Sequence, residues 1–220
     1  MKNKQPIKVA LADDHVLLRN ALASLIDGFE NCKVICQFSD GSELLNFVQK
    51  ESPPDVVLLD LNMPTMDGYD TAIWFKKNKP DINILMLTMY DSELLLIRLL
   101  QAGVRGFLKK DIHPGELELA IETVMKSGYY SSNYTSGKLA NLFRLGKEDN
   151  PLLEKAMLNK QELQFLHLAC SEMTYKEIAL EMKLNPRGVD SLRDHLFDKL
   201  DVKSRVGLAL FAIKNGVVTL

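Results

Sequence analysis

Three acidic side chains stand directly after two short apolar segments of the chain. Asp13 and Asp14 follow residues 7–12, and Asp60 follows the four apolar residues 56–59. Four apolar residues are too few for a helix, so they indicate a strand that is buried on both faces, as strands of parallel sheets are. Ligands of open α/β sheets bind at the carboxyl edge of such strands. These carboxylates are therefore expected where such a sheet does its chemistry.

Asp60 alone allows two interpretations. Asn62, Pro64 and Gly68 follow it, and all three residue types are typical of turns, so Asp60 could cap a tight turn or act as a chemical group. The two earlier aspartates favour the chemical group, because parallel strands bring all three carboxylates to one edge. Unpaired carboxylates this close raise one another's pKa and weaken the fold unless a cation lies among them. A hard divalent cation with oxygen ligands removes the conflict, and Mg²⁺ fits best.

Two later apolar segments end in side chains that can bind anionic oxygens. Residues 83–88 end in Thr88, and residues 104–110 end in Lys110. Together with the aspartates, this hydroxyl and this cation indicate a site that forms and holds a phosphoryl group on a carboxylate. Asp60 would be the nucleophile, the metal would neutralise the phosphoryl oxygens, and Thr88 and Lys110 would bind the remaining oxygens.

Segments with helical periodicity separate the strands and must position these residues. A further strand is predicted at residues 33–38, and helices are predicted at 15–27, 43–50, 68–77, 92–101 and 114–126. Pro114 in the first turn and Gly128 after the end mark the last of these helices. Five strand–helix units in this order predict an α/β doubly wound, flavodoxin-like parallel five-stranded sheet.

The pattern of strand ends resembles the receiver domain of bacterial two-component response regulators. The resemblance implies that Mg²⁺ is held by Asp13, Asp14, Asp60 and Asn62, that Asp60 is the phosphoacceptor, and that Thr88, Phe107 and Lys110 bind the phosphoryl group and switch the domain. It also implies a histidine kinase as the phosphodonor and a homodimer on activation. Asp111 stands where many receivers have proline, which affects loop geometry rather than chemistry.

Four further helices are predicted in the last third of the chain. Asn159 with Glu162, and Thr174 with Glu177, have the spacing of capping boxes at helix starts. Asn185-Pro186 and Ser204 open the other two helices, which predicts a small all-α four-helix domain. Two short helices with a tight connection and a longer one after them suggest helix-turn-helix, although length alone would support any small helical bundle.

The stretches Glu172-Met-Thr-Tyr-Lys-Glu-Ile-Ala179 and Lys199-Leu-Asp-Val-Lys-Ser-Arg-Val206 resemble the NarL/LuxR type of helix-turn-helix output domain. The resemblance implies that residues 186–200 form a recognition helix that lies in the major groove of promoter DNA. The residues that it offers for DNA contacts are Arg187, Asp190, Ser191, Arg193, Asp194, Lys199, Lys203 and Arg205.

The recognition helix departs from the usual pattern at two positions. Asp190 and Asp194 stand where lysine or another donor is common. An aspartate can accept a hydrogen bond from cytosine N4, but it repels phosphates, and Arg187 and Arg193 neutralise these acids only in part. DNA binding is therefore expected to be weak for a monomer and to depend on dimerisation. The alternative is an output domain that acts through protein–protein contact, with weak or no DNA binding.

These features predict a receiver domain at residues 1–128, a linker with a possible short helix at 129–158, and a helix-turn-helix DNA-binding domain at 159–220. The favoured function is transcription regulation, in which phosphorylation of Asp60 by a histidine kinase controls dimerisation and DNA binding. A hydrolytic enzyme of the haloacid phosphotransferase type fits poorly, because such enzymes need a cap domain that the sequence does not show. No enzymatic activity is expected beyond self-catalysed phosphotransfer and autodephosphorylation.

Composition and charge agree with a two-domain regulator. The chain has 220 residues, 46% of them apolar and 25% charged. Residues 1–128 carry 14 basic against 18 acidic residues, and residues 155–220 carry 10 against 8, so the halves are expected to meet different partners. No apolar run reaches the ~18 residues that span a membrane, and no signal peptide opens the chain, which predicts a cytoplasmic protein without a membrane partner.

The three cysteines, Cys32, Cys36 and Cys170, lack the spacing of a metal or redox site. They are expected to be small, semi-buried thiols in a reducing compartment. Cys32 and Cys36 are four residues apart on a predicted strand, so they are expected to lie on the same face of the sheet.

Overall fold

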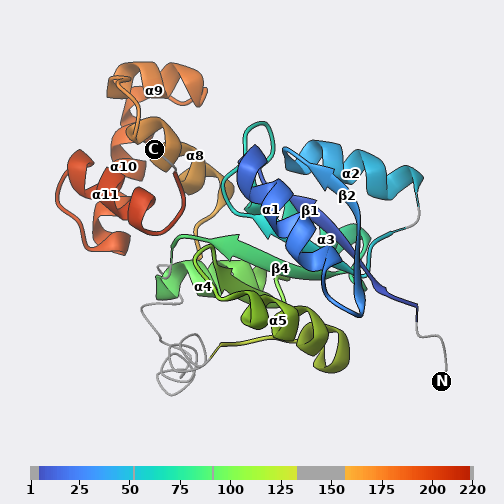
Figure 1. Cartoon of the computed structure of the whole chain (residues 1–220). Helices are drawn as coiled ribbons and strands as arrows, with labels where there is room; N and C mark the ends of the chain where they lie inside the picture. Colours follow the sequence, from blue (N-terminus) through green and yellow to red (C-terminus); the bar gives the residue numbers. More distant parts are fainter. Residues whose placement is uncertain (1–4, 52, 91, 133–156, 219–220) are drawn as a thin grey trace. The chain divides into compact units, whose positions relative to one another are not determined.

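A computed structural model describes residues 5–51, 53–90, 92–132 and 157–218 of the chain. The chain divides into two compact units, one built on a sheet and one that holds the four C-terminal helices (Figure 1). The possible short helix of the predicted linker, at residues 138–145, lies outside the described residues. Because the linker prediction covers mostly such residues, the domain boundaries stay predictions.

The sheet has five strands, and every neighbouring pair is parallel. The strands are β1 (Ile7–Ala12), β2 (Cys32–Phe38), β3 (Val56–Asp60), β4 (Asn83–Thr88) and β5 (Gly106–Lys109), in the order β2-β1-β3-β4-β5. This is the predicted flavodoxin-like sheet. The chain order of the strands reverses between β1 and β3, and in open α/β sheets this switch point is where ligands bind.

Helices cover both faces of the sheet (Figure 1). They are α1 (Val16–Asp27), α2 (Gly41–Lys50), α3 (Gly68–Asn78) and α5 (Pro114–Ser127), and the chain also forms α4 (Glu93–Gln101) between β4 and β5. Ile26 of α1 and Ile121 of α5 belong to one buried cluster with Leu58 of β3. The strand neighbours of Leu58, Val57 and Leu59, point to the other face and are also fully buried. A strand buried on both faces has no polar alternation, which is why the apolar run before Asp60 identified it.

Local signals in the sequence fix where the helices begin and end. The Asp40 side chain caps α2 by accepting hydrogen bonds from the backbone N–H groups of Ser42 and Glu43. Pro114 is in the first turn of α5, and Gly128 ends this helix in the left-handed conformation, with φ 77°. The predicted helix starts are therefore confirmed to within about two residues, the usual uncertainty of helix boundaries.

A bulge in β2 corrects the prediction for the cysteines. Val9 of β1 pairs with Val34, but Ala10 pairs with Cys36, so Ile35 is an extra residue in the strand. A shift of one residue moves the following side chains to the opposite face. Cys32 lies in the cluster under α1 and α5, whereas Cys36 is paired with Ala10 of the other face, and both thiols are free.

The second unit contains α8 (Lys160–Ala169), α9 (Tyr175–Glu181), α10 (Pro186–Leu200) and α11 (Arg205–Lys214). Both predicted capping boxes are present, Asn159 with Glu162 and Thr174 with Glu177. Each helix contributes one fully buried residue to a single cluster: Phe165, Ile178, Val189 and Leu208. The four-helix prediction is confirmed, and the short α9 followed by the longer α10 gives the helix-turn-helix order.

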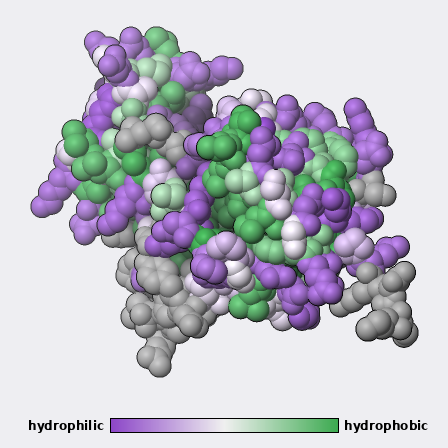
Figure 2. All heavy atoms as spheres, viewed as in Figure 1, coloured by the Kyte–Doolittle hydropathy of each residue, from purple (hydrophilic) through white to green (hydrophobic). Residues whose placement is uncertain are grey.

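On the face shown in Figure 2, hydrophilic side chains alternate with groups of apolar ones. Val16 and Leu17, at the start of α1, are 60% and 85% exposed. Among the described residues, no helix is long and apolar enough to cross a membrane.

Gly68, the first residue of α3, is predicted to be essential for the packing of β3 against this helix. A Cβ at this position would lie 2.2 Å from the backbone oxygen of Asp60 and 2.9 Å from Cα of Leu61, so the backbone would have to move. Gly68→Ala should therefore lower the free energy of unfolding by about 2 kcal/mol or more. Urea titration followed by the fluorescence of Trp74, the single tryptophan, measures this change.

Gly115→Ala is the matched control, because a Cβ there would meet only Nδ1 of His113, at 3.6 Å. Alanine is the better helix former, so this variant should be neutral or slightly more stable. Equal destabilisation by the two substitutions would contradict the close approach assigned to Gly68.

Candidate functional site

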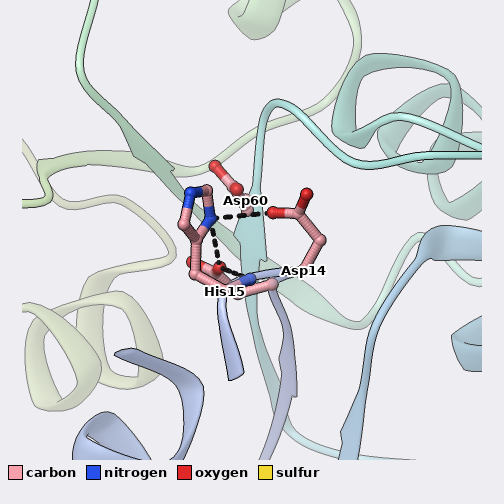
Figure 3. Close-up of side chains that lie close together, drawn as sticks. Asp14, His15 and Asp60 are labelled. Carbon is pink, nitrogen blue, oxygen red and sulfur yellow. Dashed lines mark hydrogen bonds and ion pairs between the residues drawn. The ribbon is translucent and has the colours of Figure 1, made fainter. Parts of the chain in front are cut away.

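The predicted acidic edge exists, and two of its carboxylates are buried. Asp60 is the last residue of β3, and Asp13 directly follows β1; each is 1% exposed. Ala12 pairs with Leu59, so the two strands deliver these aspartates side by side. Asp14 is more open, with a side chain that is 37% exposed (Figure 3). The structure thus brings together the three carboxylates that the sequence placed at one edge.

Lys110 provides the positive charge for the two buried carboxylates. Its Nζ donates a hydrogen bond to Oδ2 of Asp60 at 2.7 Å and lies 3.1 Å from Oδ2 of Asp13. Burial by itself would lower the pKa of Lys110, but the hydrogen bond to Asp60 and the charges of Asp60 and Asp13 raise it above its usual value. β5 ends one residue earlier than predicted, at Lys109, and Lys110 lies in the turn that follows.

Asp60 has the ionisation that a carboxylate nucleophile needs. Burial raises its pKa to about 6, the charge of Asp13 adds to the rise, and Lys110 and the backbone N–H of Asn62 oppose it by hydrogen bonding. The side chain is therefore mainly a carboxylate at neutral pH. A raised pKa also means a more basic oxygen, which favours nucleophilic attack.

The acidic cluster has the donor set for a divalent cation. Four residues each offer one ligand atom, and these atoms lie within 4.8 Å of one another. They are Asp13, Asp14, His15 and Asp60. Oδ2 of Asp13 is buried and accepts no hydrogen bond from the described residues, although Lys110 is close enough for an ion pair. A buried carboxylate oxygen without a donor is costly, and a metal ion would satisfy it. The residues present therefore fit Mg²⁺.

Thr88 and Phe107 occupy the positions predicted for the switch residues. Thr88 ends β4 and is 3% exposed, and its Oγ1 accepts a hydrogen bond from the backbone N–H of Tyr90 at 3.0 Å. Its own hydroxyl proton remains able to donate to an anionic oxygen. Phe107 of β5 is 5% exposed, so its ring is packed inside the unit.

His15 is a member of the cluster that the sequence analysis missed. Its Nδ1 lies 2.8 Å from Oδ1 of Asp14 and 3.2 Å from Oδ1 of Asp13 (Figure 3). Its backbone N–H donates a hydrogen bond to the same Asp13 oxygen at 2.8 Å, which fixes the residue beside the acids. The sequence feature that could have identified it is its position, directly after two aspartates at the end of a strand.

The predicted DNA contacts fall into two groups. The residues of the first group are exposed: Arg187, Asp190, Ser191, Asp194 and Lys203. Lys199, in contrast, lies 2.9 Å from Oε1 of the buried Glu162 and donates to the backbone oxygen of Met157. Arg205 donates to the backbone oxygens of Ala169 and Ser171. The structure therefore gives Lys199 and Arg205 partners within the unit, and whether they also contact DNA stays a prediction.

Arg193 belongs to an internal network on α10, the predicted recognition helix. Its guanidinium donates to Asp190 and Asp194 at 2.8 Å and lies 5.2 Å from the ring centroid of Tyr175 in α9. Hydrogen bonding to Asp194 raises the pKa of Arg193, and the charges of both aspartates contribute. One arginine thus neutralises two exposed carboxylates only in part, which leaves net negative charge on this part of the helix.

Comparisons with known proteins agree with both units. Residues 9–122 match the family described as the response regulator receiver domain, and residues 156–212 match the bacterial regulatory proteins of the luxR family. The chain is 31% identical to the oxygen regulatory protein NreC of Staphylococcus haemolyticus (strain JCSC1435), over 95% of this chain and 98% of that protein. It is 30% identical to the response regulator GacA of Pseudomonas aeruginosa, over 96% of this chain and 98% of GacA.

A solved structure shares the fold. It is RcsB from Salmonella enterica serovar Typhimurium bound to the promoter rprA in the presence of the phosphomimetic BeF3-, with a TM-score of 0.67, 23% identity, and coverage of 94% of this chain and 98% of that one. A receiver sheet and a LuxR-type helical unit define a class of regulatory protein. The chain belongs to the bacterial response regulators of the LuxR/NarL type, which have a DNA-binding output domain.

The Glu162–Lys199 pair predicts how stability of the output unit depends on pH. Burial raises the pKa of Glu162, but hydrogen bonds from the Asn159 N–H and from Lys199 outweigh this and hold the pKa below its usual value. A carboxylate with a lowered pKa stabilises the fold above its unfolded pKa of about 4.3, and this stabilisation is lost as pH falls through the folded pKa. At pH 7, Glu162→Gln should cost about 2 kcal/mol, because Lys199 loses its charged partner.

The difference between the wild-type protein and Glu162→Gln should therefore shrink below about pH 4.3. Amide hydrogen exchange of peptides from α8 and α10, compared between the two proteins at pH 7 and at pH 3.5, measures it. The exposed Glu172, replaced by Gln, is the control and should change exchange at neither pH. A constant difference at both pH values would show that the Glu162 carboxylate does not stabilise the unit through its charge.

Proposed function

We propose that Asp60 accepts a phosphoryl group from the phosphohistidine of a histidine kinase, and that this controls pairing of two copies and their binding to promoter DNA. The observation that carries the proposal is the ion pair of buried Asp60 with Lys110, next to the acidic cluster that fits a cation. The membership of the chain in the response regulators supports it. The protein is proposed to act in the cytoplasm, without enzymatic activity beyond phosphotransfer to itself and loss of that phosphoryl group.

The chemistry follows from the groups at the edge of the sheet. A carboxylate oxygen of Asp60 attacks phosphorus, the P–N bond of the phosphohistidine breaks, and the released imidazole nitrogen takes up a proton. The product is an acyl phosphate on Asp60. Mg²⁺ would be held by Asp13, Asp14, Asp60 and the backbone carbonyl of Asn62. When bound, it would neutralise charge on the phosphoryl oxygens. Lys110 is placed to exchange its contact with Asp60 for one with a phosphoryl oxygen.

Thr88 and Phe107 are proposed to transmit the change. The Thr88 hydroxyl is at the end of β4, where its proton can be donated to a phosphoryl oxygen while Oγ1 accepts from the Tyr90 N–H. Thr88 of β4 pairs with Lys109, two residues after Phe107 in β5, so a movement of Thr88 is proposed to change the space beside the Phe107 ring. To shift a two-state equilibrium from 1:99 to 99:1, phosphorylation must favour the active state by about 5.5 kcal/mol.

DNA binding by the full-length protein tests the proposed function. Binding to a pool of genomic DNA fragments is measured at two salt concentrations, with and without Mg²⁺ and a small-molecule phosphodonor such as acetyl phosphate. The phosphodonor should tighten binding to a sequence-related subset of fragments, and Asp60→Asn should abolish this gain. Phosphorylation of Asp60 without any salt-sensitive DNA binding would instead indicate an output domain that acts through protein contacts.

The acids on α10 predict a variant that binds DNA more tightly than the wild-type protein. Asp194 is exposed and carries charge that repels phosphates, so Asp194→Asn should raise DNA affinity about three- to tenfold at low salt. Asp198→Asn, a neutral substitution nearer the end of the same helix, should have a smaller effect. Fluorescence anisotropy with one selected fragment measures both variants. Weaker binding of Asp194→Asn, confined to fragments with a particular cytosine, would show that Asp194 reads a base instead.

A further inference from the structure

We infer that the receiver unit binds a small organic phosphate in a basic cavity at the edge where its strands begin, opposite Asp60. Ile82 and Arg105 line this cavity, and they directly precede β4 and β5. Asp60 ends β3, and the strands are parallel, so it lies at the other edge of the sheet. The inference therefore goes beyond the proposed function and does not depend on it.

The cavity has room for a phosphate group with a small apolar body. Its volume is about 190 Å³. An apolar cavity of about 150 Å³ holds a benzene molecule, so a single six-membered ring or a short chain fits. Drug-sized ligands need about 300 Å³ or more, which makes a larger ligand a poor match.

Three cationic side chains from separate positions line the cavity. Lys76 is in the last turn of α3, Lys79 is the C-cap of this helix, and Arg105 lies just before β5. Among the described residues, no acidic side chain lines the cavity, and Asp81, which is close in the sequence, is exposed. An anion would therefore meet positive side chains and no negative one.

Helix ends explain part of this positive charge. Nζ of Lys76 donates to the backbone oxygen of Gln101, the last residue of α4, at 2.6 Å. The Arg105 guanidinium donates to the backbone oxygens of Pro80 at 3.0 Å and of Gly128, the C-cap of α5, at 3.5 Å. Each helix C-terminus carries about half a negative elementary charge. The ends of α3, α4 and α5 thus balance only about half of the three positive charges.

The remaining charge selects phosphate over carboxylate. About 1.5 positive charges are left after the helix ends are counted. A phosphate monoester carries about −1.5 to −2 charges at pH 7, whereas a carboxylate carries only one. The planar guanidinium of Arg105 also matches phosphate oxygens with pairs of N–H donors.

The cationic groups are held in place without a ligand. Gly103, in the loop before β5, has a left-handed backbone with φ 96°, and a Cβ there would lie 3.0 Å from Cβ of Lys76. The alkyl chain of Lys76 therefore lies along Gly103 on its way to the oxygen of Gln101. Two hydrogen bonds fix the guanidinium of Arg105, which has five N–H donors and can offer others to an anion. Binding would then cost little conformational entropy.

The rest of the wall is apolar and indicates an organic ligand. Ile82 is 7% exposed, and Tyr129, which also lines the cavity, is 54% exposed. Inorganic phosphate would leave these side chains in contact with water. A phosphate ester with a ring or a short chain would cover them and gain the burial of apolar surface.

Nuclear magnetic resonance of the ¹⁵N-labelled full-length protein tests the inference. Phenyl phosphate, inorganic phosphate and benzyl alcohol are titrated at constant ionic strength, with EDTA present so that no divalent cation brings phosphate to the acidic edge. The backbone amide signals of Gly103 and Tyr129 report on the cavity. Lys79→Gln and Arg105→Gln each remove one of its cations. Lys77→Gln is the matched control, because Lys77 is in the last turn of α3 but is exposed and does not line the cavity.

The inference predicts saturable shifts of both signals with phenyl phosphate, and binding of inorganic phosphate and of benzyl alcohol that is at least about fivefold weaker. Lys79→Gln and Arg105→Gln should each weaken the binding of phenyl phosphate about fivefold or more, and Lys77→Gln less than about twofold. If Arg105→Gln does not fold because its two hydrogen bonds are lost, Lys79→Gln alone decides.

Three results would overturn the inference. The first is the absence of saturable shifts at Gly103 and Tyr129. The second is equal weakening by Lys77→Gln and Lys79→Gln, which would indicate attraction to general surface charge. The third is equally tight binding of inorganic phosphate and phenyl phosphate, which would indicate an adventitious ion only. None of these results bears on phosphorylation of Asp60, so the proposed function would stand.

Discussion

The ion pair between Lys110 and Asp60 is the interaction on which the receiver unit depends. Asp60 and Asp13 are both buried, and an isolated buried carboxylate is strongly unfavourable. Lys110 lies within 3.1 Å of both acids, so one cation compensates two anions incompletely. The site therefore retains an excess of negative charge, and a divalent cation would relieve it. Burial raises the pKa of Asp60, and the charge of Asp13 adds to the rise, which suits this carboxylate to act as a phosphoacceptor.

The topology of the sheet makes this ion pair possible. Asp13, Asp60 and Lys110 are far apart in the sequence, and each follows or ends a strand whose other residues are mostly apolar. Parallel pairing in the order β2-β1-β3-β4-β5 brings the ends of these strands to one edge. Gly68 adds a second constraint, since only a residue without a side chain allows α3 to begin so close to the backbone of Asp60. Fold and site are thus determined by the same few positions.

The sequence predicted the features that depend on local patterns. Apolar runs gave the five strands, and capping residues such as Asn159 and Thr174 gave the helix starts of the second unit. Features that depend on tertiary partners were not predictable in this way. The bulge at Ile35 changed the face of Cys36, and Lys199 and Arg205 proved to have partners more than 30 residues away. His15 was missed because its contacts with Asp13 and Asp14 depend on the direction of its ring, which the spacing of residues does not show.

The chemical identity of the phosphorylated residue tests the central claim most directly. The full-length protein is incubated with a phosphodonor and Mg²⁺, reduced with borohydride, which converts an aspartyl phosphate to homoserine, and digested for mass spectrometry. The charge balance at the sheet edge predicts homoserine at position 60 alone, and none when Lys110→Ala removes the cation that compensates the buried acids. Homoserine at position 13 or 14, or none at position 60 in the wild-type protein, would contradict the role assigned to Asp60.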